Sequence, residues 1–472
     1  LWQSLFADPQ FGQALAATLV STLLSVGGAL IITLTVVAAL WPSGGWRRLA
    51  ARLPLLLAVP HVAFATAALL LFAESGWLSR LFPLFSPPID RYGIGLGLTM
   101  AMKESAFLLW VVYGLLGEKR LVEQATVLKS LGYGRWQCLT WLVLPTLLPA
   151  LSVVLLATAA WSLSAVDVAL VIGPGNPPTL AVLAWQWLSQ GDERQQAKGA
   201  LASLILLLAL AMMALAAWGV WRLWRRRIPP VEGIRRPQPR ALAGKSFALL
   251  LPLCGVACAL LLAAAAQNSQ PVHDSVGNSL WLGLCSAAIG AVICLLWLAL
   301  GPSRFGEWIW LPLILPALPL VDGQYQLALY TWLDGERLTV LWGHLLWVVP
   351  WMLFILRPAW RARDPRAELV ARTLGWQRGR IFWLVTLPAL TRPLLTALAV
   401  GFSVSIAQYL PTLWLGGGRV ATLTSEAVAL SSGGDTSTLA AQALWQLLLP
   451  ALFFAATALL AWLIGRYRQG LR

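Results

Sequence analysis

The sequence predicts an all-α polytopic membrane protein made of two parallel repeats of one helical unit. The chain has 472 residues, of which 59% are hydrophobic and only 11% are charged, a composition far from the average of soluble domains. Eleven apolar runs are long enough to cross a bilayer as helices, which takes about 20 residues each. A motif around Gly132 returns 243 residues later around Gly375, which indicates that one half of the chain duplicates the other.

The expected spans follow one another along the whole chain. Prolines inside several of them are tolerated because neighbouring membrane helices satisfy the freed backbone groups. The runs are 11–40, 53–73, 93–116, 146–172, 199–221, 246–266, 276–300, 308–330, 338–356, 389–415 and 440–464. The run 11–31 pairs with 276–296, and only the second copy is preceded by a further span, at 246–266. We therefore expect two groups of six helices, of which this chain shows eleven and lacks the first.

The charge distribution sets the expected orientation in the membrane. Lysine and arginine together number 34 against 19 acids, for a net charge of +15. Threading the spans alternately places 26 basic residues on the face that carries the repeated motif and 6 on the other. This is the positive-inside bias, so the motif is expected on the cytoplasmic face of a bacterial inner membrane. No basic patch is left over, which argues against nucleic-acid binding.

Residues 224–245 separate the two halves. This stretch holds four prolines and seven basic residues, a composition typical of an extended, exposed linker. We predict an N-terminal repeat at 1–223, a cytoplasmic linker at 224–245 and a C-terminal repeat at 246–472. Gly244-Lys245-Ser246 looks like the end of a phosphate-binding loop, but the glycine that this motif needs is replaced by Pro239.

We expect neither a cofactor nor an ATP site in this chain. The five cysteines and three histidines are too scattered to form a metal site or to activate a thiol nucleophile. Cys254 and Cys258 lie four residues apart on an apolar helix, where small buried side chains are the simpler interpretation.

The repeated motif has a common design. Its copies are LKSLGYGRWQCLTWLVLP at 128–145 and ARTLGWQRGRIFWLVTLP at 371–388. A helix-compatible run precedes each, from Glu118 to Leu131 and from Asp364 to Leu374, and the glycine that follows can close a helix in the left-handed conformation. A second basic, amphipathic stretch then leads to a proline at the start of the next span. We expect a helix, a sharp turn and a short helix held against the cytoplasmic surface.

This pattern resembles the cytoplasmic coupling loop, called the EAA loop, of type I ABC importer permeases. Both copies have thirteen residues from the glycine to the proline. The parallel duplication and the proline-rich linker resemble fused permeases of thiamine, iron(III) and related importers. The resemblance implies a coupling role for the matching positions in the two copies, which are Glu123, Lys129, Gly132, Arg135 and Pro145, and Glu368, Arg372, Gly375, Arg378 and Pro388.

The match departs from the family pattern at the acidic position. The family's glutamate usually lies six residues before the glycine, whereas Glu123 lies nine before and Glu368 seven before. The sequence therefore leaves open which carboxylate anchors each loop. The alternative to a coupling loop is an ordinary basic helix next to the membrane, although two copies with one spacing are hard to obtain by chance.

Polar side chains inside predicted spans are candidates for a translocation path, because they are costly in a bilayer and tend to face the bundle interior. They are Lys103, Glu104, Asp167 and Gln408. Lys103 and Glu104 are neighbours on a helix and point in different directions, so each is expected to need a partner from elsewhere. Asp167 and Gln408 end similar segments of the two halves. Hydrogen bonding between helices is the structural alternative for all four.

The resemblance implies a permease without chemistry of its own. Its expected partners are two copies of a separate ABC ATPase on the cytoplasmic face, which bind the ATP, an extracytoplasmic solute-binding protein, the lipid membrane and a small solute. Thiamine or another small solute is the expected substrate class. The alternatives are an ion-coupled secondary transporter, disfavoured by parallel repeats and few intramembrane carboxylates, and a membrane enzyme, for which no catalytic constellation is seen.

Overall fold

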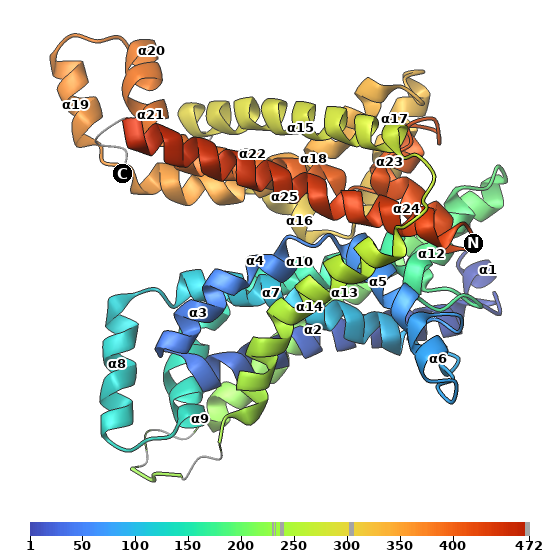
Figure 1. Cartoon of the computed structure of the whole chain (residues 1–472), viewed down its shortest axis with the longest axis horizontal. Coiled ribbons are helices and arrows are strands. Elements are labelled where there is room, and N and C mark those ends of the chain that lie inside the picture. Colours follow the sequence, from blue (N-terminus) through green and yellow to red (C-terminus); the bar gives the residue numbers. More distant parts are fainter. Residues whose placement is uncertain (229–230, 232, 237–239, 302–305, 468–472) are drawn as a thin grey trace. The chain divides into compact units, whose positions relative to one another are not determined.

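The computed structural model describes residues 1–228, 231, 233–236, 240–301 and 306–467. All regular elements in these ranges are helices (Figure 1). Nine of the described helices are long and apolar enough to cross a membrane, and a tenth span is obtained if one bent pair of helices is counted as one. The predicted all-α polytopic fold is confirmed.

The chain divides into two compact units, and each is described by itself. Unit 1 comprises residues 1–268 with 313–322 and 428–440, and unit 2 comprises 269–312, 323–427 and 441–472. The helices up to residue 265 are α1 (Trp2–Phe6), α2 (Phe11–Leu40), α3 (Gly44–Arg52), α4 (Pro54–Leu57), α5 (His61–Phe72), α6 (Trp77–Leu81), α7 (Ile94–Leu115), α8 (Lys119–Ser130), α9 (Arg135–Cys138), the π-helix η1 (Leu139–Val143), α10 (Leu144–Ser164), α11 (Asp167–Ile172), α12 (Leu180–Leu188), α13 (Glu193–Arg227) and α14 (Leu242–Ala265).

The later helices repeat much of this order. They are α15 (His273–Leu300), the 3-10 helix η2 (Gly306–Trp310), α16 (Leu311–Ile314), α17 (Ala317–Tyr330), α18 (Arg337–Ala362), α19 (Arg366–Thr373), α20 (Arg378–Ile381), the π-helix η3 (Phe382–Thr386), α21 (Leu387–Ala389), α22 (Thr391–Ile406), α23 (Leu410–Leu415), α24 (Leu423–Ser431) and α25 (Thr436–Tyr467).

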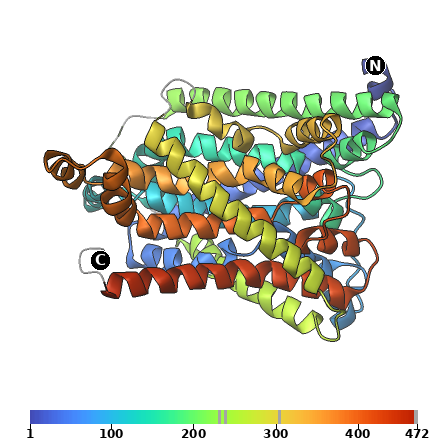
Figure 2. The same cartoon turned by 90° about the horizontal axis from the view of Figure 1, so that it is seen from above.

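The two halves match element by element at the separation seen in the motif. Helices α7, α9, η1, α11, α12 and α13 begin 243 residues before α18, α20, η3, α23, α24 and α25. Helix α13, with 35 residues, is seen along its length in Figure 2. The duplication therefore extends from the third predicted span to the end of each half.

Small residues let the central helices of unit 1 approach closely. Helix α2 runs along α7, and a Cβ added at Gly28 would lie only 2.8 Å from the Cβ of Ala101. A Cβ at Gly97 would lie 2.7 Å from the Cβ of Leu24. The apolar core around this pair also includes buried residues of α3, η1, α10 and α14. Such close packing by small residues is the usual way in which membrane helices associate.

Unit 2 has the same kind of core. Helices α15, α18 and α22 pack together around Met352, which is fully buried. Cβ atoms added at Gly290 and Gly401 would lie 2.7 and 2.5 Å from its Sδ atom. The thioether therefore fills space that only glycine leaves open on both neighbouring helices.

Helix α14 belongs to the second repeat by sequence but packs in unit 1. A Cβ at Gly255 would lie 2.1 Å from the carbonyl oxygen of Leu55, and a Cβ at Gly244 would lie 2.4 Å from the Cβ of Ala39. The unit that packs together is thus not the unit that repeats in sequence. The predicted boundaries 1–223, 224–245 and 246–472 concern the repeat and stay a prediction, and part of the linker lies outside the described residues.

Four predicted spans are broken rather than continuous. The span 53–73 is interrupted at residues 58–60, between α4 and α5. The span 308–330 consists of short helices interrupted next to Pro316, which lacks the N–H that a continuous helix would use. The span 146–172 breaks after Ser164, and 389–415 breaks after Ile406. Counting by helix length therefore gives nine or ten spans in the described residues rather than the eleven that hydropathy suggests. The breaks at Ser164 and Ile406 lie at equivalent places in the two halves.

Candidate functional site

Both copies of the motif fold into the same elbow. The first elbow, residues 119–145, consists of α8, the turn at Gly132, α9 and η1, and the second, residues 366–388, consists of α19, the turn at Gly375, α20 and η3. The two glycines have φ of +88° and +83°, as expected for left-handed helix ends. Pro145 and Pro388 lie in the first turns of α10 and α21.

Matching hydrogen bonds close the two turns. In the first elbow the N–H of Tyr133 donates to the carbonyl of Leu128 at 3.2 Å, and in the second that of Trp376 donates to Ala371 at 3.1 Å. The glycine N–H groups donate to Lys129 and Arg372 at 3.0 and 2.9 Å. These pairs of bonds satisfy the last carbonyls of each helix and form the Schellman motif. The elbow shape is therefore fixed by the backbone.

Glu368 anchors the second elbow. Its Oε1 accepts hydrogen bonds from Nε of Arg363 at 2.8 Å and from the hydroxyl of Thr386 at 2.9 Å, so one carboxylate joins the segment after α18, α19 and η3. Partial burial acts to raise the pKa of Glu368, but the hydrogen bonds from Arg363 and Thr386 outweigh it and hold this pKa below its usual 4.5.

The first elbow is anchored without charge. The positions equivalent to Glu368 and Thr386 are Ala125 and Val143, which are buried in the apolar core of unit 1. Glu123, the acid considered from the sequence, is exposed on α8. The same two places thus hold an apolar pair in the first elbow and a hydrogen-bonded pair in the second. Only the second elbow is anchored by a carboxylate, that of Glu368.

Each elbow also borders a cavity, but at a different place. A cavity of about 330 Å³ lies behind the second elbow, with Glu368 and Thr386 in its wall. A much smaller one of about 10 Å³ lies between the first elbow and the end of α2, where Lys129 and Arg135 face Val37 and Trp41.

The outward faces of the elbows carry apolar and basic side chains. Val127 and Leu131 on the first elbow are 57% and 49% exposed, and their equivalents Val370 and Leu374 on the second are 56% and 69% exposed. Arg372 and Arg378 of the second elbow are also exposed. An exposed apolar surface bordered by charge on a rigid support is typical of a protein interaction site.

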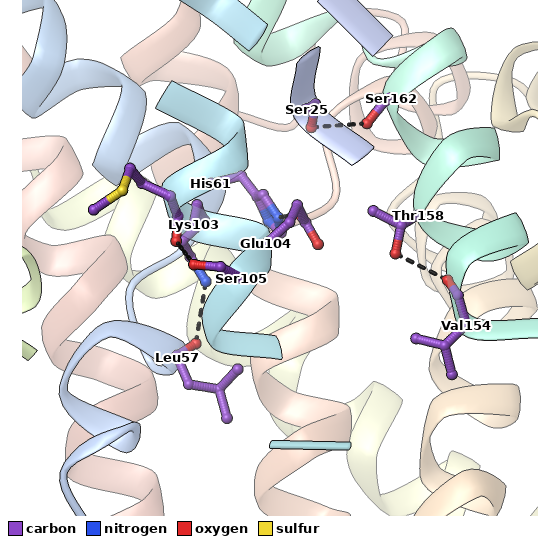
Figure 3. A network of polar contacts seen from close by, with 10 residues as sticks. Ser25, Leu57, His61, Lys103, Glu104, Ser105, Val154, Thr158 and Ser162 are labelled. Atoms are coloured by element: carbon purple, nitrogen blue, oxygen red, sulfur yellow. Dashed lines mark hydrogen bonds and ion pairs between the residues drawn. The ribbon is translucent and has the colours of Figure 1, made fainter. Parts of the chain in front are cut away.

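A second candidate site is a buried polar cluster in unit 1 (Figure 3). Nε2 of His61, the first residue of α5, contacts Oε1 of Glu104 on α7. The amino group of Lys103 donates instead to the carbonyl of Leu57 at 3.4 Å. Lys103 and Glu104 are only 4% and 6% exposed. As expected from their positions on the helix, both residues have partners from other elements.

Further groups surround His61. The ring of Trp161 on α10 lies 4.3 Å from the imidazole, centroid to centroid. Asp167 begins α11, which packs against α5, and its Oδ1 accepts from the N–H of Val168 at 2.9 Å. Of the four path candidates, Glu104 therefore contacts the histidine directly, while Lys103 and Asp167 have backbone partners.

Unit 2 holds an uncharged counterpart. Nδ1 and Nε2 of His344 on α18 are 2.8 and 2.7 Å from the hydroxyls of Ser405 and Thr412, and the ring is 1% exposed. The places of Lys103 and Glu104 are taken by Leu346 and Trp347. Among the residues that the structure describes, the fully buried charged side chains, Lys103 and Glu104, therefore lie in one of the two halves.

The pairing of Asp167 with Gln408 needs correction. At the separation that aligns α11 with α23, Asp167 corresponds to Leu410, whereas Gln408 corresponds to Ala165 in the break before α11. The error arose because the similar patterns Ser162-Leu-Ser164 and Ser403-Val-Ser405 are two residues closer together in the chain than the equivalent helices are. Gln408 lies in the break before α23, where its carbonyl accepts from the hydroxyl of Thr412 at 3.0 Å.

Sequence reasoning missed His61 and His344, because it searched for histidines close together in the chain. Both partners of His61 are more than forty positions away. One signal was available. His61 is a polar residue inside an apolar run, and the buried charges of Lys103 and Glu104 needed partners from another span. Among the described residues there is no group of three potential metal ligands.

Comparison with known proteins agrees with this geometry. Residues 247–468 match the family model described as the binding-protein-dependent transport system inner membrane component. The chain is also similar to the inner membrane ABC transporter permease protein YnjC of Escherichia coli (strain K12), with 60% identity over 471 residues, which covers 100% of this chain and 92% of that protein. The chain therefore belongs to the inner-membrane permeases of binding-protein-dependent ABC transport systems.

Proposed function

We propose that this chain supplies both membrane halves of an ABC importer. Two copies of a separate ATPase subunit dock on the two elbows, one on each, and hydrolyse the ATP that drives transport. An extracytoplasmic binding protein delivers the solute to the opposite face. The chain itself performs no chemistry, and its elbows transmit the movement of the ATPase subunits to the membrane helices.

The observation that carries the proposal is the matching backbone of the two glycine turns. Equivalent glycines have almost the same φ, and the same two hydrogen bonds close each turn, although the residues that anchor the elbows differ. Two copies of one partner need two surfaces of the same shape, and the backbone provides it. Exposed apolar residues at equivalent positions, such as Leu131 and Leu374, supply area for docking.

An ion-coupled secondary transporter has no comparable need for paired elbows. It would instead depend on titratable groups in both halves of a path, whereas the buried charges described above lie in unit 1. We therefore prefer the ATP-driven function.

The substrate is proposed more coarsely, as a small solute of the thiamine type. This proposal is supported by the resemblance to fused permeases alone. Identification of the ligand of the partner binding protein would test it, and a ligand of another chemical class would replace it.

The docking proposal predicts that straightened elbows lose the ATPase. Gly132→Val and Gly375→Val each place a β-branched residue at positive φ, where L-residues are disfavoured by about 1–2 kcal/mol. When the double variant is purified from the native host, the amount of ATPase subunit bound to it should fall by about tenfold or more. Gly379→Val is the control, because Gly379 lies in the same elbow with open space around its Cβ position and no positive φ. Equal retention by the double variant and the control would contradict the proposal.

A further inference from the structure

The linker between the halves lies against the first elbow. Nε2 of Gln137 on α9 donates to the carbonyl of Ile234 at 2.8 Å. A Cβ added at Gly132 would lie 2.9 Å from Cδ and 3.1 Å from Nε of Arg235. The same construction at Gly375 meets nothing within 4 Å. In Figure 1 the yellow-green stretch after α13 passes the ends of α8 and α9. Residues 234 and 235 therefore lie at the glycine turn of the first elbow, and in the described part of the chain no residue takes this place at the second.

The second elbow presents three arginines around its turn. Arg372, Arg378 and Arg380 are all exposed. The guanidinium of Arg380 stacks over the ring of Trp376, with its carbon 4.5 Å from the ring centroid. These side chains place positive charge directly beside the glycine that forms the elbow.

The equivalent residues of the first elbow carry one positive charge fewer. They are Lys129, which is exposed, Arg135, which is half-buried, and the uncharged Gln137. The amino group of Lys129 donates to the carbonyl of Trp41 at 3.4 Å. Arg135 lines the small cavity behind the elbow, and its Nη1 is buried without a hydrogen-bond partner among the described residues. Gln137 has no charge, and it is the residue that holds the linker.

We propose that Arg235 of the linker supplies the guanidinium that the first elbow lacks at Gln137. Residues 234 and 235 and the first elbow then form one composite docking surface for an acidic region of the ATPase subunit. The inference rests on the proposed function, because two copies of one ATPase present the same groove to both elbows. A groove that meets Arg380 on one side needs a positive charge at the same place on the other.

The simpler interpretation of Arg235 is a topology signal, like the other basic residues of the linker. Arg236 provides the matched control, since it has the same charge, is also exposed and lies one residue further along. Reversal of either charge changes the positive-inside balance equally. A difference between the two variants therefore reports on the contact with the elbow and not on membrane orientation.

The test uses the intact complex purified with its ATPase subunit from native membranes. The variants are Arg235→Glu, Arg236→Glu, Arg235→Ala, and Arg235→Ala combined with Gln137→Arg. The measurements are the amount of ATPase subunit retained per permease in gel filtration and the rate of ATP hydrolysis, at about 50 mM and about 500 mM NaCl, because ion pairs weaken with salt. Charge reversal at an interface slows association and weakens binding, so Arg235→Glu should retain about tenfold less ATPase at low salt.

The other variants decide the interpretation. Arg236→Glu should retain an amount of ATPase subunit within about twofold of that of the unaltered complex. Gln137→Arg should restore the retention that Arg235→Ala loses, because it places a positive charge at the position equivalent to Arg380. Equal effects of Arg235→Glu and Arg236→Glu, no effect of either, or no rescue by Gln137→Arg would overturn the inference while leaving the proposed function intact. An unaltered permease that retains no ATPase would overturn both.

Discussion

At the scale of single residues, Glu104 is the side chain on which the buried charges of unit 1 depend. It contacts His61 and lies next to Lys103 in the chain, and both carboxylate and ammonium are almost fully buried. A buried charge without a counter-charge is strongly destabilising, whereas an apolar replacement of both partners is often tolerated. The second repeat shows such a replacement, with Leu346 and Trp347 at the equivalent positions.

This arrangement predicts opposite results for single and double substitution. Glu104→Leu should destabilise the protein by about 3 kcal/mol because the buried ammonium of Lys103, although hydrogen-bonded to Leu57, then loses the favourable electrostatic effect of the neighbouring carboxylate. Adding Lys103→Leu should recover most of that loss. The temperature at which half of the protein leaves the monodisperse peak in size-exclusion chromatography measures both. A double variant as unstable as the single one would show that the charges do not compensate each other.

The same double variant separates structure from transport. If it is stable and still transports solute at the normal rate, the charges serve helix packing alone. If it is stable and transport is lost, Lys103 and Glu104 belong to the translocation path, as proposed from the sequence.

At the scale of elements, the two elbows show one backbone design with two kinds of anchor. The first is held by Ala125 and Val143 within an apolar core, and the second by Glu368 between Arg363 and Thr386. Apolar packing does not change with pH, whereas a carboxylate that accepts two hydrogen bonds does. The elbows should therefore respond differently to acid.

Acid should loosen the second elbow and leave the first unchanged. The pKa of Glu368 in the folded protein lies below its usual 4.5, so its contribution to stability is complete above about pH 4.5 and is lost as the pH falls through the lower folded value. Hydrogen exchange of residues 366–388, corrected for the intrinsic pH dependence of exchange, should show this loss. Residues 119–145 are the internal control.

A substitution makes the same point at neutral pH. Glu368→Gln should reduce protection of the second elbow by about fivefold, as expected for one partly exposed charge-assisted hydrogen bond. Glu123→Gln on the exposed face of the first elbow should have no effect. Equal effects of the two substitutions would show that Glu368 is not the anchor.

At the scale of the whole molecule, the fold is a duplication whose halves have diverged. Helices recur at one separation along most of each half, but the buried charges lie around His61, the hydrogen-bonded anchor is Glu368, and the linker contacts the turn at Gly132. A fused chain can diverge in this way because each half is made in a single copy and always meets the other.

Membrane orientation is the prediction that concerns the whole chain. With the five native cysteines replaced, Ser130→Cys at the end of α8 should react with a membrane-impermeant maleimide in inverted vesicles and not in spheroplasts. Ser75→Cys, after α5, should show the reverse. The expectation follows from the 26 basic residues on the elbow face against 6 on the other. Labelling of both cysteines from the same side would contradict the threading.

The sequence by itself determined the class, the repeat and the elbows. A segment in a bilayer must satisfy its own backbone hydrogen bonds, so apolar length predicts helices directly, and Gly132 and Gly375 predict left-handed turns because few other residues adopt them. These features depend on neighbours along the chain. The broken span at 308–330 was missed because hydropathy does not register a local interruption near Pro316.

Only the tertiary structure decided which side chains meet. His61 contacts Glu104, and Arg235 lies beside Gly132, although these residues are far apart in the sequence. Helix packing likewise determined that Glu368, and not Glu123, is an anchor. Such contacts follow from how helices rotate and approach one another, which the small residues at their interfaces allow but do not specify. A single sequence shows which groups need partners, and packing determines which partners they find.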